Sequence, residues 1–282
     1  MELRQLRAFA AVVDAGTFTD AAAELGVSQA SVSRSVAALE RALGVPLLQR
    51  TTRHVALTPT GRRVLDGARR ILEEAGRLRR IAEEQTAELR VGYAWAALGR
   101  HTRRVQRAWA AGHPGTPLVF VHTNTLSAGL SDATADVAVI RRPLDDQRFA
   151  TALIGTESRC AAVATDNPLA RRRTVQLSDL SRYPVAIDDR TGTTTLDLWH
   201  PAPAPAVIRA THGVDEWLTL IAAGQAVGIT SEATASQNPR PGVAYRTLRH
   251  VPPIEVHLAW WRDDPPALLA ELIRLSRAVY AG

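Results

Sequence analysis

The sequence predicts an α/β protein in which an all-α N-terminal domain and one long linker helix precede a larger region of two α/β subdomains. Apolar residues recur at helical spacing through the first 45 residues. An apolar stripe then continues without interruption from Pro59 to about Gln85, and past Thr86 short apolar runs alternate with helical stretches. The chain of 282 residues is long for one compact domain and suits a small domain followed by a larger one.

The N-terminal region is expected to form three helices. Apolar residues at helical spacing predict a first helix over residues 2–14. Thr19 is expected to cap a second helix that stops at Gly26, because glycine tolerates the positive φ of a helix end. Ser28 is expected to cap a third helix that Gly44 ends. The buried face of this third helix carries apolar residues at spacings of four, three and four: Val32, Val36, Leu39 and Leu43.

The opposite face of the third helix carries short or forked hydrogen-bonding side chains near its N-terminal end: Gln29, Ser31, Ser33 and Arg34. A recognition helix presents that end to base edges in the major groove of DNA. The basic, β-branched run 50–54 before Val55 predicts a β-hairpin wing that contacts phosphates or enters the minor groove. The alternative is a helical hairpin with a solvated polar face. The wing favours a winged helix-turn-helix domain.

This region resembles the N-terminal domain of the LysR-type transcriptional regulators. The resemblance extends over residues 21–61, AAAELGVSQASVSRSVAALERALGVPLLQRTTRHVALTPTG, and includes the opening MELRQLRAFAAVVDAGTFT. One departure is Ala30, where the family usually has proline. The resemblance implies binding to double-stranded DNA at a pseudo-palindromic operator, with RNA polymerase as a further partner of an activator. The residues expected to contact DNA are Thr19, Ser28, Gln29, Ser31, Ser33, Arg34, Arg50 and Arg53.

The next segment is expected to be a dimerisation helix. Thr58 and Pro59 predict its start, since a hydroxyl cap followed by proline is typical of a first helical turn. A helix from Pro59 to Gln85 would be roughly 40 Å long. So narrow an apolar stripe on so long a helix indicates a partner helix, the alternative being a helix packed on its own domain. The expected dimer contacts are Val64, Ala68, Ile71, Ala75, Leu78 and Ala82. The resemblance implies a homodimer or homotetramer.

The rest of the chain alternates short apolar runs with helical stretches, a pattern that predicts parallel sheets with crossover helices. Strands are expected at 89–93, 118–121, 137–140, 160–163, 185–187, 207–208, 227–229 and 254–261. The first three form one set, the strand at 160–163 begins a second set, and the strand at 254–261 is expected to return to the first set. Helices are expected at 98–111, near 126–130, and at 214–223 and 266–280. This half resembles the effector-binding domain of the same family, which implies two Rossmann-like subdomains similar to the type 2 periplasmic binding proteins.

The expected domain boundaries follow from these patterns. A winged helix-turn-helix DNA-binding domain covers residues 1–58, a linker and dimerisation helix covers 59–87, and an effector-binding domain covers 88–282. Within the last, subdomain I is expected at about 88–154 and 250–282, and subdomain II at about 155–249. Two crossing strands would join the subdomains and leave a cleft between them.

Candidate cleft residues follow the expected strands or begin helices, where backbone N–H groups favour anions. They are Trp95, Ala97, Thr123, Thr125, Arg141, Thr193, Thr194 and Thr230. Hydroxyl, amide and guanidinium groups suit a carboxylate, so we expect a small organic acid, with any aromatic part near Trp95. The alternative for each residue is an ordinary helix cap or solvated loop.

Other classes of function receive less support. Asp188 with Asp189 and Asp263 with Asp264 are adjacent pairs, and the eight histidines show no HExxH spacing, so we expect neither an enzyme nor a cofactor or metal site. A solute-binding protein would leave the first 85 residues without a use. A ligand-independent or redox-responsive regulator stays open as an alternative, with Cys160, the only cysteine, as the candidate sensor.

The sequence contains no membrane-length apolar stretch and no signal pattern, which predicts a cytoplasmic protein without membrane contact. The net charge of +6 suits a polyanion partner.

Overall fold

The computed structural model describes residues 1–50, 55–83, 88–200 and 204–281, with the side chains of Arg50, Glu73, Arg77 and residues 79–83 left out. The chain divides into two compact units, one of residues 1–85 with Ser131–Ala133 and one of residues 86–130 with 134–282. In the described part, no helix is long and apolar enough to cross a membrane.

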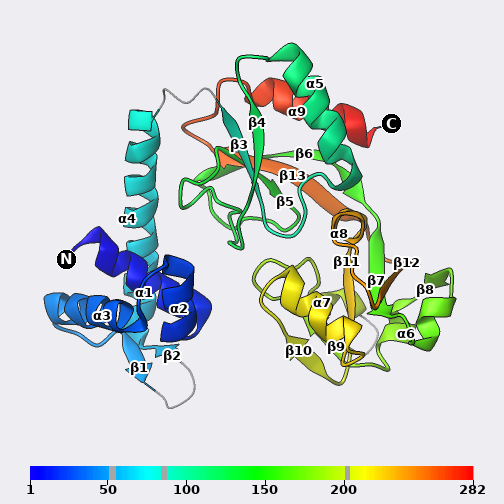
Figure 1. The fold of residues 1–282 in the computed structure, drawn as a ribbon, viewed down its shortest axis with the longest axis horizontal. Coiled ribbons are helices and arrows are strands. Elements are labelled where there is room, and N and C mark those ends of the chain that lie inside the picture. The colour runs from blue at the N-terminus through cyan, green and yellow to red at the C-terminus, as the bar shows by residue number, and fades with distance from the viewer. Residues whose placement is uncertain (51–54, 84–87, 201–203, 282) are drawn as a thin grey trace. The chain divides into compact units, whose positions relative to one another are not determined.

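The first unit consists of three short helices, a two-stranded hairpin and one long helix (Figure 1). Its elements are α1 (Leu3–Ala15), α2 (Phe18–Leu25), α3 (Gln29–Leu43), β1 (Leu48–Arg50), β2 (Val55–Leu57) and α4 (Pro59–Glu83). The antiparallel hairpin β1–β2 is the expected wing, although its tip, residues 51–54, lies outside the described residues. Fully buried Phe9, Val36 and Leu39 form the centre of the core. Helix α3 is therefore held by Val32, Val36 and Leu39 as its spacing predicts, whereas Leu43, expected on the same buried face, is exposed at the end of the helix.

The ends of the first three helices follow the expected signals with one exception. Gly16, Gly26 and Gly44 follow α1, α2 and α3 with φ of 77°, 64° and 70°, a conformation that favours glycine. Ser28 caps α3, accepting a hydrogen bond from the Ser31 amide at 3.3 Å. Glycine and serine therefore mark the turn between α2 and α3 as expected.

The expected cap of α2 at Thr19 is wrong, because the helix begins two residues earlier. Thr17 has extended backbone angles, and its Oγ1 accepts a hydrogen bond from the Asp20 amide at 3.0 Å. The same hydroxyl donates to the Asp20 carboxylate at 2.6 Å. Asp20 thus supplies the reciprocal partner three residues after the cap, which Thr19 lacks. Thr19 lies inside α2 with an exposed side chain.

Helix α4 starts as predicted, and the residues of its apolar stripe are buried near its start and exposed further along. The Thr58 hydroxyl accepts a hydrogen bond from the Gly61 amide at 2.8 Å, which confirms the cap before Pro59. Leu65 and Ala68 are buried in the core of the first unit. Ile71 is 42% exposed and Leu78 is 62% exposed. The first turns of α4 therefore pack on their own unit, whereas the later part presents apolar side chains outward.

In the second unit, subdomain I is built on a five-stranded sheet of order β4-β3-β5-β13-β6 (Figure 1). The strands are β3 (Leu89–Tyr93), β4 (Leu118–His122), β5 (Val137–Ile140), β6 (Phe149–Glu157) and β13 (Ile254–Trp261). The helices of this sheet are the 3-10 turn η1 (Gly99–His101), α5 (Thr102–Gly112) and α9 (Leu269–Tyr280). Trp109 of α5 and Leu272 of α9 share a buried cluster with Val91 and Val139 of the sheet. Helices α5 and α9 therefore cover the sheet together.

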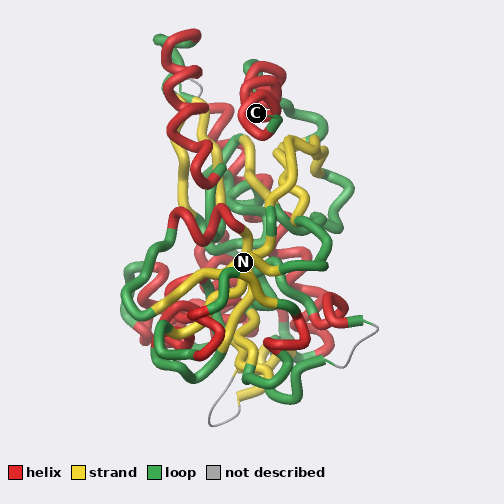
Figure 2. The backbone as a smooth tube through the Cα atoms, turned by 90° about the vertical axis from the view of Figure 1, so that its right-hand side faces the viewer, coloured by secondary structure: helices red, strands yellow, loops and turns green. Residues whose placement is uncertain are grey.

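Subdomain II is built on a six-stranded sheet of order β10-β9-β11-β7-β12-β8, with helices against its strands (Figure 2). The strands are β7 (Arg159–Ala164), β8 (Thr174–Val175), β9 (Val185–Ile187), β10 (Ile208–Ala210), β11 (Val227–Ser231) and β12 (Val243–Leu248). The helices are η2 (Pro168–Arg171), α6 (Leu177–Leu180), η3 (Leu196–Trp199), α7 (Val214–Ala222) and α8 (Glu232–Gln237). Trp217 of α7 is buried against this sheet, and its Nε1 donates to the Ala186 carbonyl at 3.0 Å.

Both sheets are mixed, so the expectation of parallel sheets is wrong for the crossing strands. In subdomain I, β3 pairs in parallel with β4 and β5, but β13 is antiparallel to β5 and β6. In subdomain II, β9 pairs in parallel with β10 and β11, but β7 is antiparallel to β11 and β12. The chain leaves subdomain I at the end of β6 and returns to it at the start of β13. These two strands pair with each other in antiparallel orientation. Figure 1 shows these two passages between the sheets.

One expected helix is absent, and three strands were not expected. The short helix expected near 126–130 is a series of turns, in which Ala128 has φ of 48° and Gly129 has φ of 90°. Two successive positive φ values are incompatible with a right-handed helix. The strands that were not expected are β6, β8 and β12, and the mixed exposed and buried side chains of β6 form no continuous apolar run. The crossing between sheets lies at Ser158, directly after β6.

The cap of α2 generates a first prediction. Replacing Thr17 by alanine removes the acceptor of the Asp20 amide and should destabilise the first unit by about 1 kcal/mol. Thr19→Ala is the matched control, and it should leave stability nearly unchanged because Thr19 lies inside the helix. The measurement is amide hydrogen exchange across residues 18–25 during urea titration. Equal exchange in the two variants would contradict the assignment of the cap.

Candidate functional site

The polar face of α3 is available for contact. Gln29 and Arg34 are exposed, and Ser31 and Ser33 are half-buried on the same helix. Ser28 is exposed but its hydroxyl caps the helix. The wing residues Arg50 and Arg53 cannot be placed here, since the Arg50 side chain and residues 51–54 lie outside the described residues.

The expected dimerisation residues fall into a group that is packed in the first unit and a group that is exposed. Val64 and Ala68 pack in the core of the first unit, Ala75 is half-buried, and Ile71 and Leu78 are exposed. The Ala82 side chain lies outside the described residues. A dimer contact through this stripe stays a prediction, and only its later positions present an open apolar surface.

A cleft of about 90 Å³ lies between subdomains I and II. Subdomain I contributes Trp95, Thr125 and Arg142 to its lining. Subdomain II contributes a loop after β9, together with the start of α8. These lining residues are Arg190, Thr191, Thr193 and Thr234. Apolar side chains complete the wall, and no carboxylate is among the lining residues. The cleft therefore combines guanidinium and hydroxyl groups with an apolar floor.

Four of the eight expected cleft residues line this cleft: Trp95, Thr125, Arg141 and Thr193. The hydroxyl of Thr125 accepts a hydrogen bond from the Gly129 amide at 3.0 Å, so it also holds the turn after β4. The hydroxyl of Thr193 is buried and has no hydrogen-bond partner among the described residues. A buried polar atom without a partner costs free energy, so Thr193 is the expected residue best suited to meet a ligand.

The other four expected residues do not reach the lining. Thr230 is buried within β11, and Thr194 donates its hydroxyl to the Ile229 carbonyl at 2.8 Å. Thr123 is half-buried with an unpartnered hydroxyl, and Ala97 is buried. Thr194 and Ala97 are therefore packed in the interior, and neither forms the helix cap or solvated loop that was the alternative to ligand contact.

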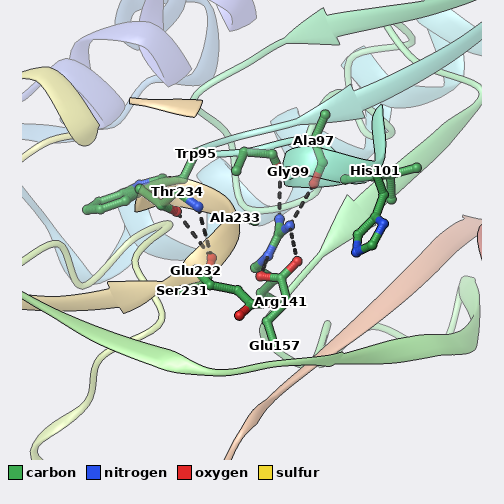
Figure 3. Close-up of polar contacts among 12 residues, drawn as sticks. Trp95, Ala97, Gly99, His101, Arg141, Glu157, Ser231, Glu232, Ala233 and Thr234 are labelled. Carbon is green, nitrogen blue, oxygen red and sulfur yellow. Dashed lines mark hydrogen bonds and ion pairs between the residues drawn. The ribbon is translucent and has the colours of Figure 1, made fainter. Parts of the chain in front are cut away.

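Arg141 forms a buried ion pair with Glu157, the last residue of strand β6 (Figure 3). Its Nε donates to Glu157 Oε2 and its Nη2 to Glu157 Oε1, both at 2.9 Å. The two side chains are 6% and 2% exposed. Its Nη1 and Nη2 also donate to the carbonyls of Ala96 and Ala97, each at 2.6 Å. The guanidinium therefore ties β5 to the end of β6 and holds the loop that carries Trp95.

Glu157 remains ionised because its partners outweigh its burial. Burial alone would raise the pKa of the Glu157 carboxyl, but the charge and hydrogen bonds of Arg141 lower it below its ordinary value. Hydrogen bonds from Tyr280 and Ser231 act in the same direction. The Tyr280 hydroxyl donates to Glu157 Oε1 at 2.7 Å, and burial followed by the Glu157 charge raises the pKa of this tyrosine. The C-terminal helix is thereby joined to the crossing strand.

Asn124 and Arg142 directly follow expected strands and were candidates from the sequence, whereas Asp188 was considered only as one of two adjacent carboxylates. Asp188 is 2% exposed and accepts hydrogen bonds from the Trp95 indole and from backbone amides. Arg142 donates to carbonyls of the loop after β9. Asn124 meets Thr191 across the cleft at 3.0 Å. Their common signal is position directly after a strand of either sheet, but the pairing across the cleft is a tertiary property.

Cys160 is poorly suited to redox sensing. It lies in β7 with its side chain half-buried. Burial raises the pKa of the Cys160 thiol to about 11, and the charges of Glu232 and Glu157 add to the shift. The thiolate is the reactive form, so this environment suppresses oxidation and alkylation. In the part of the chain that the structure describes, no group of His, Cys, Asp and Glu could hold a metal ion.

The ion pair generates a second prediction. Arg141→Met should destabilise the second unit by about 3–5 kcal/mol, because it leaves Glu157 buried without its cation. The double variant Arg141→Met with Glu157→Gln should recover most of this loss in a double-mutant cycle measured by urea unfolding.

The same pair predicts an opposite pH dependence in the two proteins. In the native chain the lowered pKa of Glu157 contributes stability above the unfolded carboxyl pKa, which is lost as pH falls through the folded pKa. In Arg141→Met, burial raises that pKa, so acidification favours the fold. The stability difference between the proteins should therefore shrink from pH 7 towards pH 4, and a constant difference would contradict the assignment.

The thiol generates a third prediction. Because its pKa is about 11, only about 0.1% of Cys160 is thiolate at pH 8. Iodoacetamide should therefore label the native protein far more slowly than the urea-unfolded protein, as followed by mass spectrometry. Rapid labelling of the native protein would restore Cys160 as a candidate sensor.

Comparisons with known proteins agree with this architecture. Residues 3–62 match the family described as bacterial regulatory helix-turn-helix protein, lysR family, and residues 82–281 match the LysR substrate binding domain. The chain is 31% identical over 305 residues to the transcriptional regulator IlvR of Caulobacter vibrioides, covering 98% of this chain and 97% of IlvR. It is 33% identical over 207 residues to the transcriptional regulator YnfL of Escherichia coli, covering 70% of this chain and 69% of YnfL.

A solved structure extends the likeness to a complex with DNA. Full-length CbnR bound to its target DNA is 28% identical, with a TM-score of 0.57, and the match covers 99% of this chain and 100% of CbnR. These relatives are transcriptional regulators rather than enzymes. The chain therefore belongs to the LysR family of DNA-binding transcriptional regulators, with an N-terminal helix-turn-helix domain and a C-terminal effector-binding domain.

Proposed function

We propose that the protein binds a pseudo-palindromic operator in the cytoplasm, with α3 in the major groove of each half-site. Gln29, Ser33 and Arg34 face the bases in this proposal, and Arg53 of the wing enters the minor groove. The exposure of Gln29 and Arg34 supports it, as does the firm burial of the opposite face of α3 in the core. A rigid helix that presents forked and amide donors at its N-terminal half suits readout of base edges.

The proposed assembly is a dimer, or a tetramer of two dimers, joined through the later part of α4. The exposed Ile71 and Leu78 lie seven residues apart, which places them on one face of the helix. Pairing two such faces would remove both side chains from water. It would also set the spacing between two DNA-binding domains.

DNA recognition generates a fourth prediction. Gln29→Ala should cost about 1–3 kcal/mol at the base pair it contacts and relax preference there. Arg53→Ala should weaken binding about equally on all sequences and reduce the salt dependence, if its contacts are to phosphate. Binding-site selection with each variant, at two salt concentrations, separates these outcomes. Unchanged preference in Gln29→Ala would remove that residue from the recognition surface.

The proposed effector is a small organic acid held in the cleft. The observation that carries this proposal is Arg142, a cleft-lining cation whose hydrogen-bond partners among the described residues are all neutral main-chain carbonyls. Arg141 was expected to hold the acid, but its charge is already neutralised by Glu157. Arg142 therefore takes the anchoring role in this proposal, with the Thr193 hydroxyl as a further donor and Trp95 as an apolar wall. An effector that changes the affinity for DNA must have its own affinity changed by DNA by the same factor.

Effector binding generates a fifth prediction. A panel of mono- and dicarboxylates, scored by melting temperature and tryptophan fluorescence, should contain acids that stabilise the protein. Arg142→Gln should weaken their binding about tenfold or more, since a charge-assisted hydrogen bond is worth about 1.5–3 kcal/mol. Arg148→Gln is the matched control, because Arg148 pairs with Asp146 within subdomain I. If no acid shifts either signal, the carboxylate proposal fails.

A further inference from the structure

The loop that follows β9 receives polar contacts from subdomain I. The Trp95 Nε1 lies 2.9 Å from the Thr191 hydroxyl and 3.3 Å from Asp188 Oδ2. The Thr191 hydroxyl lies 3.0 Å from Asn124 Oδ1. Trp95 and Asn124 follow β3 and β4 of subdomain I, whereas Asp188 and Thr191 follow β9 of subdomain II. The contacts therefore join the two subdomains across the cleft.

Asp188 gives this loop a defined shape. Its carboxylate is buried, and it accepts hydrogen bonds from the amides of Arg190 at 2.9 Å, Thr191 at 3.2 Å and Gly213 at 2.9 Å. The Thr191 hydroxyl is also within hydrogen-bond distance of Asp188 Oδ2, at 2.8 Å. A buried carboxylate with this many donors is well satisfied and restrains each of them. The loop is thus held in place before it meets Trp95 and Arg142.

Arg142 makes the second part of the connection. Its Nη1 lies 2.6 Å from the Asp189 carbonyl, 3.3 Å from the Gly192 carbonyl and 3.5 Å from the Arg190 carbonyl. Three carbonyl oxygens of subdomain II therefore surround one guanidinium nitrogen of subdomain I. Neutral carbonyls are weaker partners for a guanidinium than a carboxylate, which can accept two charge-assisted bonds. An anion that drew the Arg142 guanidinium towards itself would lengthen these contacts of Nη1 with the loop.

We propose that Trp95, Arg142 and the Asp188–Gly192 loop form a latch between the subdomains, and that an acid in the cleft releases it by taking Arg142 from the loop carbonyls. The release step rests on the proposed carboxylate effector, whereas the latch itself does not. The subdomains are linked covalently only through the crossings at Ser158 and between Leu248 and Ile254. Their relative position therefore depends on non-covalent contacts of this kind.

A second group of contacts joins the subdomains beside the crossing. Asn238 Nδ2 donates to the Trp95 carbonyl at 3.2 Å, and Arg100 lies 3.6 Å from Glu232. A Cβ on Gly99 would lie 2.7 Å from the Cβ of Ala233, so α8 packs closely on η1. This group borders Glu157 at the end of β6. We expect it to persist as a pivot when the latch opens.

The test measures the distance between the subdomains in the full-length protein. Spin labels are placed by Gln106→Cys on α5 and Ser178→Cys on α6, both exposed positions, in a Cys160→Ala background. Labelled chains are diluted with unlabelled protein to suppress distances between subunits. Trp95→Phe and Arg142→Gln should each shift the distance distribution by several ångströms or broaden it. The double variant should shift it further.

The matched control is Trp261→Phe. This change also removes an indole hydrogen bond, but that bond runs to the Leu130 carbonyl within subdomain I, away from Trp95. The control should keep the native distance distribution even if it lowers stability. Native distributions in both Trp95→Phe and Arg142→Gln would overturn the latch, as would an equal shift in the control.

The release step has its own readout, with benzoate and succinate as the probe acids. If the latch competes with the acid, Asn124→Ala, which removes the contact with Thr191 but does not alter a lining residue of the cleft, should bind the probe several-fold more tightly than the native protein, while Arg142→Gln binds it more weakly. Weaker binding in both variants would overturn the competition but leave the carboxylate proposal standing. Opening of the variants without binding of any acid would leave the latch standing and remove the carboxylate proposal.

Discussion

The arrangement of the effector-binding domain depends on one buried ion pair at the end of β6. The Arg141 guanidinium and the Glu157 carboxylate form this bidentate pair, and both are almost excluded from water. Arg141 follows β5, Glu157 ends the strand that crosses to subdomain II, and Tyr280 of the last helix adds its hydroxyl. Burying either charge alone would be unfavourable, so each group requires the other. The pair thereby fixes the loop carrying Trp95 relative to the crossing strand.

This commitment changes which residues can recognise a ligand. A cation paired with a buried carboxylate presents little net charge to the cleft, so our proposal gives the anchoring role to Arg142, one residue along the chain. Among the described residues, the Arg142 side chain donates to main-chain carbonyls, and these belong to the opposite subdomain. In the proposal, ligand recognition and the relative position of the subdomains therefore involve the same guanidinium. Such a shared group would let a ligand favour one arrangement of the subdomains, because a ligand shifts an equilibrium only through its different affinity for the two states.

The long helix shows how one sequence pattern can serve two purposes. Its apolar stripe was compatible with a partner helix and with packing on its own domain. In the structure Leu65 and Ala68 complete the core of the first unit, whereas Ile71 and Leu78 remain exposed. Periodicity identifies the face of a helix that is apolar, but it does not reveal where along the helix the neighbouring core ends.

The sequence by itself determined the elements whose signals are local. Ser28, Gly26 and Gly44 mark the helix-turn-helix because caps and positive φ depend on neighbouring residues alone. In the second half, periodicity predicted the buried strands but not β6, β8 and β12. The cap at Thr17 is also a local signal, because it depends on the reciprocal partner Asp20 three residues later. Tertiary structure decided the direction of the crossing strands, the pairing of Arg141 with Glu157 and the meeting of Trp95 with Asp188. The two side-chain contacts join residues 16 and 93 positions apart, and no local propensity specifies which distant polar group will satisfy a buried donor.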